Sequence, residues 1–280
     1  CRTGVGMKLF SPLLERRLAQ FRRNKRALWS FWLLMVVVVT CLAAPLVAND
    51  KPLIVHFKGG TYFPMLHDYP ETFWGGDFAT DTDYRDGFVT DLINKDGWLV
   101  MPPIPFTFDT INVALEEPAP SKPTAQNILG TDDQGRDVAA RLLYGLRVSI
   151  LFSFILTVFS AVIGVFAGAV QGYYGGWVDL TFQRLLEIWG GLPALFILII
   201  LSSVITPGFW SLLGVMILFS WTGLVDVVRA EFLRARNFDY VRAARALGVN
   251  DSTIMRRHIL PNAMVATLTM LPFMVTGGIT

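Results

Sequence analysis

Apolar and polar positions divide the chain into five uncharged runs and the polar stretches that separate them. The uncharged runs cover residues 27–48, 148–170, 188–205, 209–225 and 262–280. Each approaches or exceeds the length of about 18 to 20 residues that a helix needs to cross a bilayer. The pattern therefore predicts five membrane-spanning helices, with the two longest polar stretches at residues 49–147 and 226–261.

Two of these runs contain residues that predict their packing and shape. Small residues recur every fourth position along the second run, at Ser160, Gly164, Gly168 and Gly172. Such a stripe lets helices approach closely in lipid, so these residues are predicted to form a helix-packing face. The third run is interrupted by Gly190, Gly191 and Pro193, which predicts a kink.

The polar stretch before the last run predicts two short helices joined at a glycine. One helical face is formed by positions i, i+3, i+4 and i+7, occupied by Tyr240, Ala243, Ala244 and Leu247. We expect this helix to cover residues 238–247, with Asn237 as its cap and Gly248 ending it in a left-handed conformation. Asp251 is expected to cap the second helix, which leads to Pro261.

The first of these helices has a flat alanine surface flanked by Arg242 and Arg245. Its pattern alone permits two interpretations. It could be an ordinary amphipathic helix on the membrane surface, or a docking helix for a soluble partner. The choice depends on which side of the membrane the helix occupies.

Composition and charge place the polar stretches on opposite sides of a membrane. The chain is 53% hydrophobic and 16% charged, which indicates a polytopic membrane protein. Residues 1–26 hold eight Lys or Arg against one acid, and residues 229–261 hold seven Arg. By the positive-inside rule both are cytoplasmic, which agrees with the even count of four spans between them. Residues 49–147, with 15 Asp or Glu and 8 Lys or Arg, are then outside.

These signals divide the chain into four regions. They are a basic cytoplasmic N-terminus (1–26), a first transmembrane helix (27–48), an external insert with its connector (49–140) and a core of spans 2 to 5 (141–280). A cleaved signal peptide is the alternative for the first run, although its 22 residues exceed a usual signal core. Met7 is expected to be the natural start, and the chain is expected to continue beyond Thr280.

The external insert predicts a β-hairpin over residues 53–63, with a glycine-containing turn at residues 58–61. Six prolines between Met101 and Thr124 predict an extended, irregular connector. Four aromatic residues of the insert suit a surface that contacts another protein: Tyr62, Phe63, Phe73 and Trp74.

Candidate chemistry is scarce along the whole sequence. A phosphate-binding loop of the type G-x-x-x-x-G-K-[ST] does not occur, so the chain is not expected to hydrolyse ATP itself. The sequence predicts no catalytic residue and no metal site, because its histidines and cysteines lack partners at ligand spacing. Reasoning from residues leaves a multi-span protein with a basic inner loop. A receptor or scaffold whose loop binds anionic lipid or a non-ATPase partner is one alternative. A secondary transporter is a second, although no inverted pair of broken spans occurs.

The sequence AARALGVNDSTIMRRHILP, residues 243–261, resembles the cytoplasmic loop of ABC importer permeases. The family pattern is Glu-Ala-Ala, three residues, Gly, nine residues, an apolar residue, one more, Leu and Pro. Positions that match it are Ala243, Ala244, Gly248, Leu260 and Pro261. Arg242 stands where the family usually has Glu, and His258 where it often has Ile.

A second stretch resembles the dipeptide, oligopeptide and nickel group of these permeases. It is LGTDDQGRDVAARLLYGLRVSI, residues 129–150, and GYYGGWVD from Gly172 and RHILPNA from Arg257 fit the same group. The resemblance covers roughly residues 127–280. The long insert before Leu129 is similar to that of the microcin C-type oligopeptide permease subunit.

The resemblance implies an all-α polytopic membrane protein with the MetI-like permease fold, in the bacterial inner membrane. It implies an importer of oligopeptides or peptide-like compounds and does not choose among peptide, microcin, opine or nickel complex. Its implied partners are a second permease subunit, two cytoplasmic ATPase subunits and a periplasmic binding protein, with ATP and Mg²⁺ held by the ATPases. Residues implied to couple to an ATPase are Tyr240, Arg242, Ala243, Ala244, Leu247, Gly248, Leu260 and Pro261.

Overall fold

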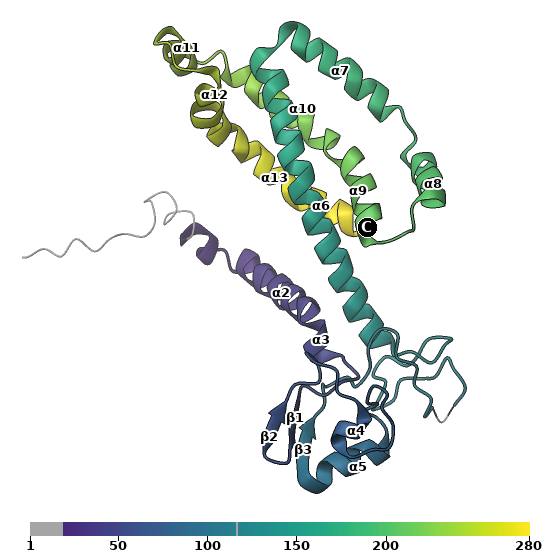
Figure 1. Ribbon diagram of the computed structural model, residues 1–280. Helices are drawn as coiled ribbons and strands as arrows, with labels where there is room; N and C mark the ends of the chain where they lie inside the picture. Colours follow the sequence, from purple (N-terminus) through teal and green to yellow (C-terminus); the bar gives the residue numbers. More distant parts are fainter. Residues whose placement is uncertain (1–18, 116) are drawn as a thin grey trace, which may run out of the picture. The chain divides into compact units, whose positions relative to one another are not determined.

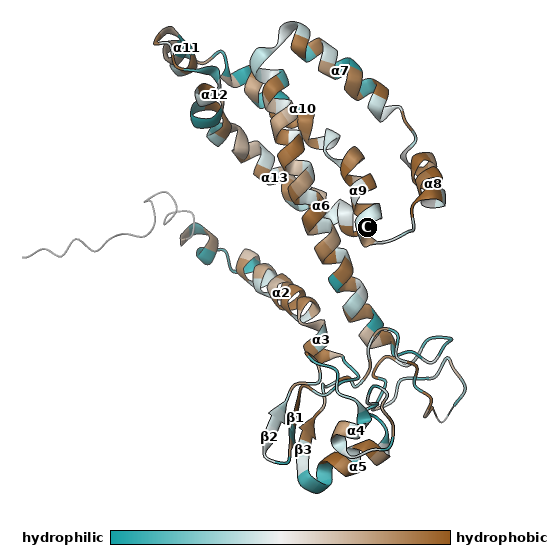
Figure 2. Cartoon of the chain, viewed as in Figure 1, coloured by the Kyte–Doolittle hydropathy of each residue, from teal (hydrophilic) through white to brown (hydrophobic). Residues whose placement is uncertain are grey.

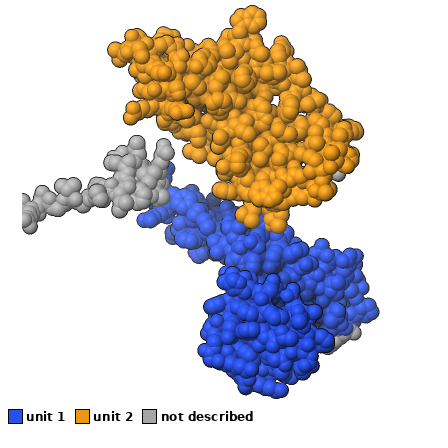
Figure 3. All heavy atoms as spheres, in the orientation of Figure 1, with its two compact units in different colours: residues 1–147 blue, residues 148–280 orange. Residues whose placement is uncertain are grey.

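The computed structural model describes residues 19–115 and 117–280. Residues 1–18, which hold the expected start at Met7 and part of the predicted basic N-terminus, lie outside the described residues. The chain forms two compact units, residues 1–147 and 148–280, shown in blue and orange in Figure 3. Each unit is described by itself.

The first unit begins with the apolar helix α2, Lys25–Leu42. The Asn24 side chain caps α2 by accepting a hydrogen bond from the backbone N–H of Ala27 at 3.3 Å. The predicted single helix over residues 27–48 is interrupted at Ala43, after which the short helix α3 covers Ala44–Val47. Pro45 explains the interruption, because it has no N–H to continue the ladder of α2.

The insert folds as a small antiparallel sheet covered by two helices (Figure 1). Its strands are β1 (Ile54–Phe57), β2 (Gly60–Tyr62) and β3 (Gly97–Val100), in the order β2-β1-β3. The predicted hairpin is confirmed, and Phe57 pairs with Gly60 across a turn in which Lys58 and Gly59 have φ of 47° and 80°. Positive φ at both turn residues matches the twist of the two strands.

Helices α4 (Glu71–Trp74) and α5 (Gly87–Asp96) and strand β3 were not predicted from the sequence. They complete a core around Trp74, which is 1% exposed and meets the rings of Phe57, Tyr62 and Tyr84 edge to face. The expectation that Trp74 serves as an external contact is therefore wrong. Phe63 and Phe73 of the same predicted surface are exposed. Residues 101–115 and 117–124 form an irregular connector, as the prolines of this stretch predict.

The second unit is a helical bundle of α6 (Val138–Tyr174), α7 (Gly176–Gly190), α8 (Ala194–Val204), α9 (Phe209–Ser220), α10 (Thr222–Ala235) and α13 (Leu260–Ile279). In this bundle α6, the pair α7–α8, the continuous stretch α9–α10 and α13 run in alternating directions (Figure 1). Brown, apolar residues cover most of them (Figure 2). Within the described residues four helices can cross a membrane, or five if the bent pair α7–α8 is one span. The structure thus agrees with a mostly helical, multi-span fold.

Two predicted spans differ in detail from the observed helices. The predicted kink is a break at residues 191–193, where α7 and α8 meet at 69°. Helix α6 has 37 residues and begins ten residues before Val148. At 1.5 Å per residue it is about 55 Å long, longer than the hydrocarbon core of about 30 Å.

Candidate functional site

The glycine stripe of α6 is the surface on which α10 lies. A Cβ atom at Gly164 would stand 2.7 Å from the carbonyl oxygen of Trp221, and one at Gly168 would stand 2.7 Å from that of Val225. At Gly172 the corresponding distance, to the carbonyl oxygen of Arg229, is 2.5 Å. These separations are shorter than any normal contact, so the two backbones approach as closely as they do only because the side chains are absent. Ser160, one turn before the first glycine, is fully buried.

An ion pair joins α7 to the same helix. Arg229 donates to Asp179 through both Nε and Nη2, and the Nη2 to Oδ2 distance is 2.7 Å. The two side chains are 28% and 12% exposed. The sequence placed Arg229 at the end of a span, but α10 continues to Ala235, and Asp179 was not recognised as its partner. Two parallel hydrogen bonds hold the carboxylate and guanidinium in a fixed geometry.

Beyond α10 the chain turns into α11, Asp239–Ala246, one residue shorter at each end than predicted. Asn237 is not its cap, which corrects the sequence prediction. The side chain of Asn237 donates to the carbonyl of Leu233 at 3.2 Å, because the residue still belongs to the final turn after α10. The cap position is Phe238, which forms no side-chain capping bond.

Gly248 ends α11 with a φ of +78°, in agreement with the prediction. The N–H of Gly248 donates to the carbonyl of Arg245 at 3.0 Å, and the N–H of Val249 donates to that of Ala244 at 3.1 Å. This pair of bonds is the Schellman motif, which favours glycine at the left-handed position. No described heavy atom lies within 4 Å of the place where a Cβ of Gly248 would stand. Glycine is therefore favoured at position 248 because of its backbone conformation and not because a side chain would lack space.

The helix after Gly248 differs from the prediction in two respects. Asn250, and not Asp251, caps α12 (Asp251–Thr253) by accepting from the N–H of Ser252 at 2.9 Å. The helix then does not end before Pro261, because a π-helical turn, η1 (Ile254–Ile259), joins it directly to α13. Pro261 has no N–H and would clash with an α-helical carbonyl, and the wider turn just before it accommodates the ring.

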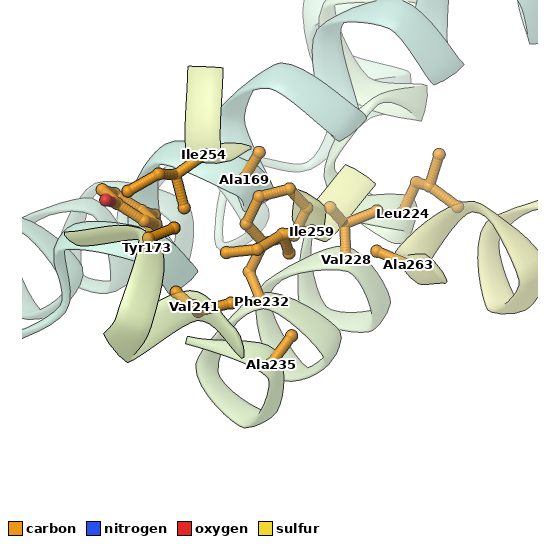
Figure 4. Close-up of a cluster of buried hydrophobic side chains, with 11 residues drawn as sticks. Ala169, Tyr173, Leu224, Val228, Phe232, Ala235, Val241, Ile254, Ile259 and Ala263 are labelled. Carbon is orange, nitrogen blue, oxygen red and sulfur yellow. The ribbon is translucent and has the colours of Figure 1, made fainter. Parts of the chain in front are cut away.

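A buried apolar cluster fixes α11 to the ends of the spans (Figure 4). Val241 and Ala244 of α11 are 0% and 8% exposed and pack with Phe232 of α10, Ile254 of η1 and Tyr173 of α6. Ala244, predicted to face a partner, thus faces the interior of this chain. Leu260, next to Pro261 at the start of α13, packs at the edge of the same cluster.

The remaining predicted coupling residues lie on the outer side of α11. Leu247 is 82% exposed, Tyr240 is 41% exposed, and Arg242 and Ala243 are exposed as well. Within the described part of the chain, Arg242 has no ion pair and no side-chain hydrogen bond. We call Tyr240, Arg242, Ala243 and Leu247 the outer face of α11. It combines a guanidinium that has no ion pair among the described residues with an exposed leucine side chain.

Comparison with known proteins identifies the class to which these features belong. The family described as "Binding-protein-dependent transport system inner membrane component" matches residues 160–280. The family described as "N-terminal TM domain of oligopeptide transport permease C" matches residues 12–77. The first match contains the glycine stripe, the ion pair and α11.

Three individual proteins extend this similarity. The chain is 53% identical over 274 residues to the inner membrane ABC transporter permease protein YejE of Escherichia coli, covering 98% of this chain and 80% of that protein. It is 50% identical over 295 residues to the peptidoglycan transport system permease protein YejE of Agrobacterium fabrum, covering 97% and 77%. It is 34% identical over 157 residues to the dipeptide transport system permease protein DppC of Bacillus subtilis, covering 56% and 49%.

Proposed function

The chain belongs to the permease family of ABC peptide importers, and from this premise we propose that α11 is the coupling helix, which docks into a groove of a cytoplasmic ATPase subunit. The observation that carries the proposal is the division of α11 into two faces. Val241 and Ala244 fix the helix to its own bundle, and the outer face is left for a partner. Permease subunits of this family are multi-pass inner-membrane proteins and not enzymes, so the ATP and Mg²⁺ would be held by the ATPase.

The chemistry of the outer face defines the groove that would receive it. Leu247, exposed over 82% of its surface, calls for an apolar pocket. The unpaired guanidinium of Arg242 calls for a carboxylate at the rim of that pocket, because a cation left without a partner on docking would lose its hydration. The proposed ATPase groove is therefore apolar at its centre and acidic at its edge.

The transport cycle follows from where α11 is attached. ATP binding would move the ATPase groove and with it α11, whose buried face is packed on α6, α10 and η1. The spans would then alternate between outward-open and inward-open arrangements. A second permease subunit, a second ATPase subunit and a periplasmic binding protein would complete the importer. The proposed cargo is an oligopeptide or a peptide-like compound, including one of microcin C type. Relatives with peptide, dipeptide and peptidoglycan transport in their names support that class.

Replacing Gly248 by valine is expected to weaken ATPase association and uptake by about tenfold, because a left-handed backbone costs a side-chain-bearing residue about 1–2 kcal/mol. Gly248→Asn is the matched control, since asparagine tolerates this conformation better. Co-purification of the ATPase and peptide uptake are measured in parallel, with membrane insertion as a check of expression. Equal ATPase yields from the valine variant, the asparagine variant and the wild type would contradict the docking assignment. A wild-type complex without any ATPase would instead support a lipid-binding scaffold.

The side on which α11 lies is tested with topology reporters. The N-terminus and residues 229–261 are proposed to be cytoplasmic and the insert external, because arginine gathers in the former and acids in the latter. A reporter that is active only outside the cytoplasm should therefore be active when fused after Lys122 and inactive when fused after Asn250. The opposite pattern would place α11 away from any cytoplasmic ATPase and would overturn the proposal.

A further inference from the structure

Tyr173, in the last turn of α6, is in contact with three other elements of the bundle. Its side chain is buried, with 3% of the residue exposed. Its hydroxyl donates a hydrogen bond of 2.5 Å to Oδ1 of Asp251, the first residue of α12. Because α12 continues through η1 into α13, this bond joins the end of one span to the beginning of another.

The same tyrosine also contacts the helices on either side of the turn at 236–238. The guanidinium of Arg245, on α11, lies 5.3 Å from the centre of the Tyr173 ring, within the range of a cation–π interaction. Nη1 of Arg236, just after α10, reaches the Tyr173 carbonyl at 3.5 Å.

These contacts differ from ordinary packing because they connect charged groups on separate elements through one residue, which uses its hydroxyl, its ring and its backbone carbonyl. The guanidinium of Arg245 contacts the ring of Tyr173, and the carboxylate of Asp251 accepts a hydrogen bond from its hydroxyl. Tyr173 of α6 therefore contacts both α11 and α12. These residues line an open pocket of about 480 Å³ at the surface of the bundle. The neighbouring Tyr174 is 53% exposed, and its hydroxyl has no hydrogen-bond partner among the described residues.

We infer that Tyr173 is a positioning residue that transmits a displacement of α11 to α6 and to the last span. The inference rests on the proposed function of α11. Without the hydroxyl, the apolar contacts around Tyr173 would still hold α11 against the bundle. Such contacts are not directional, so they would allow the helices to shift relative to α6. The hydrogen bond to the Asp251 carboxylate has a defined direction and is stronger than a bond between neutral groups, so it holds α12 in register with α6, while the ring contact with Arg245 keeps α11 against the same residue.

The test is Tyr173→Phe in the assembled complex, which removes one oxygen and keeps the ring beneath Arg245. ATPase co-purification and ATP hydrolysis should stay near wild type, while peptide transported per ATP hydrolysed should fall by about tenfold, the scale of a lost hydrogen bond to a charged group. Tyr174→Phe is the matched control and should leave this ratio unchanged. Asp251→Ala should lower the ratio to the same extent, and the double variant Tyr173→Phe/Asp251→Ala should be no worse than either single one.

Two outcomes would overturn the inference. An unchanged ratio of transport to hydrolysis in Tyr173→Phe would show that the hydroxyl does not transmit the displacement of α11 to the spans. A parallel loss of transport, hydrolysis and ATPase co-purification would show that the residue only supports the fold. A failure of the proposed function is seen separately, because the wild-type chain itself would then bring no ATPase.

Discussion

Gly172→Leu is expected to abolish uptake and to reduce the yield of folded protein severely. A Cβ at this position would stand 2.5 Å both from the carbonyl oxygen of Arg229 and from Cβ of Phe232. Neither atom is the free end of a flexible side chain, so α6 and α10 would have to separate. Overpacking of a tight site costs about 1–3 kcal/mol and sometimes more. Here it would also displace Phe232 from the cluster that holds α11, so the damage would reach the docking surface.

The control for this variant lies in the opposing helix. Gly223 of α10 is exposed and has no described heavy atom within 4 Å of its hypothetical Cβ, so Gly223→Leu should be tolerated. A graded series strengthens the comparison: Gly164→Ala and Gly168→Ala, each at 2.7 Å from a carbonyl, should lower the thermal unfolding midpoint less than Gly172→Leu does. The measurements are the unfolding midpoint in detergent and uptake in cells. Wild-type uptake by Gly172→Leu would show that the two backbones need not be close.

The spans and the glycine stripe were predictable because their signals are local. Uninterrupted apolar runs and a four-residue spacing of small residues can be read without knowing what lies opposite. The left-handed turn at Gly248 was predictable for the same reason, since the conformation is intrinsic to glycine. The predicted cap at Asn237 is wrong: α10 continues further than its apolar run, and the cap position of α11 is Phe238, whose side chain forms no capping bond. Local sequence does not reveal how far a tertiary contact extends a helix.

Features that depend on distant residues were missed or wrongly interpreted. Ala244 sits on the regular alanine face of α11, but only the fold shows that it faces Phe232 and Ile254 and not a partner. Tyr173 and Asp251 are 78 positions apart, and the sequence of neither segment predicts the hydrogen bond between them. The insert core is similar: Trp74 and Phe57 are aromatic residues in a polar stretch, and their burial depends on strand β3 closing the sheet. Sequence patterns therefore predict helices and membrane spans well, but they predict poorly which distant residues contact each other.

Asp179→Ala is expected to destabilise the bundle by about 1–3 kcal/mol, between the small effect of breaking an exposed ion pair and the larger cost of leaving a fully buried charge without its partner. Arg229 would keep its charge at a position where only 28% of its side chain is exposed, and it would lose the bidentate hydrogen bonds that fix it. The thermal unfolding midpoint of the purified permease reports the effect.

Two controls separate the pair from general damage to α7. Glu187→Ala breaks an exposed ion pair, in which the side chains of Arg184 and Glu187 are 76% and 58% exposed. This variant should change the free energy of unfolding by no more than about 1 kcal/mol. The double variant Asp179→Leu/Arg229→Met replaces both charges by apolar groups and should recover much of the lost stability, because no uncompensated charge remains. If it recovers stability without uptake, the pair serves the movement of the spans as well as their packing. If Asp179→Ala unfolds at the wild-type temperature, the bidentate contact does not hold α7 against α10.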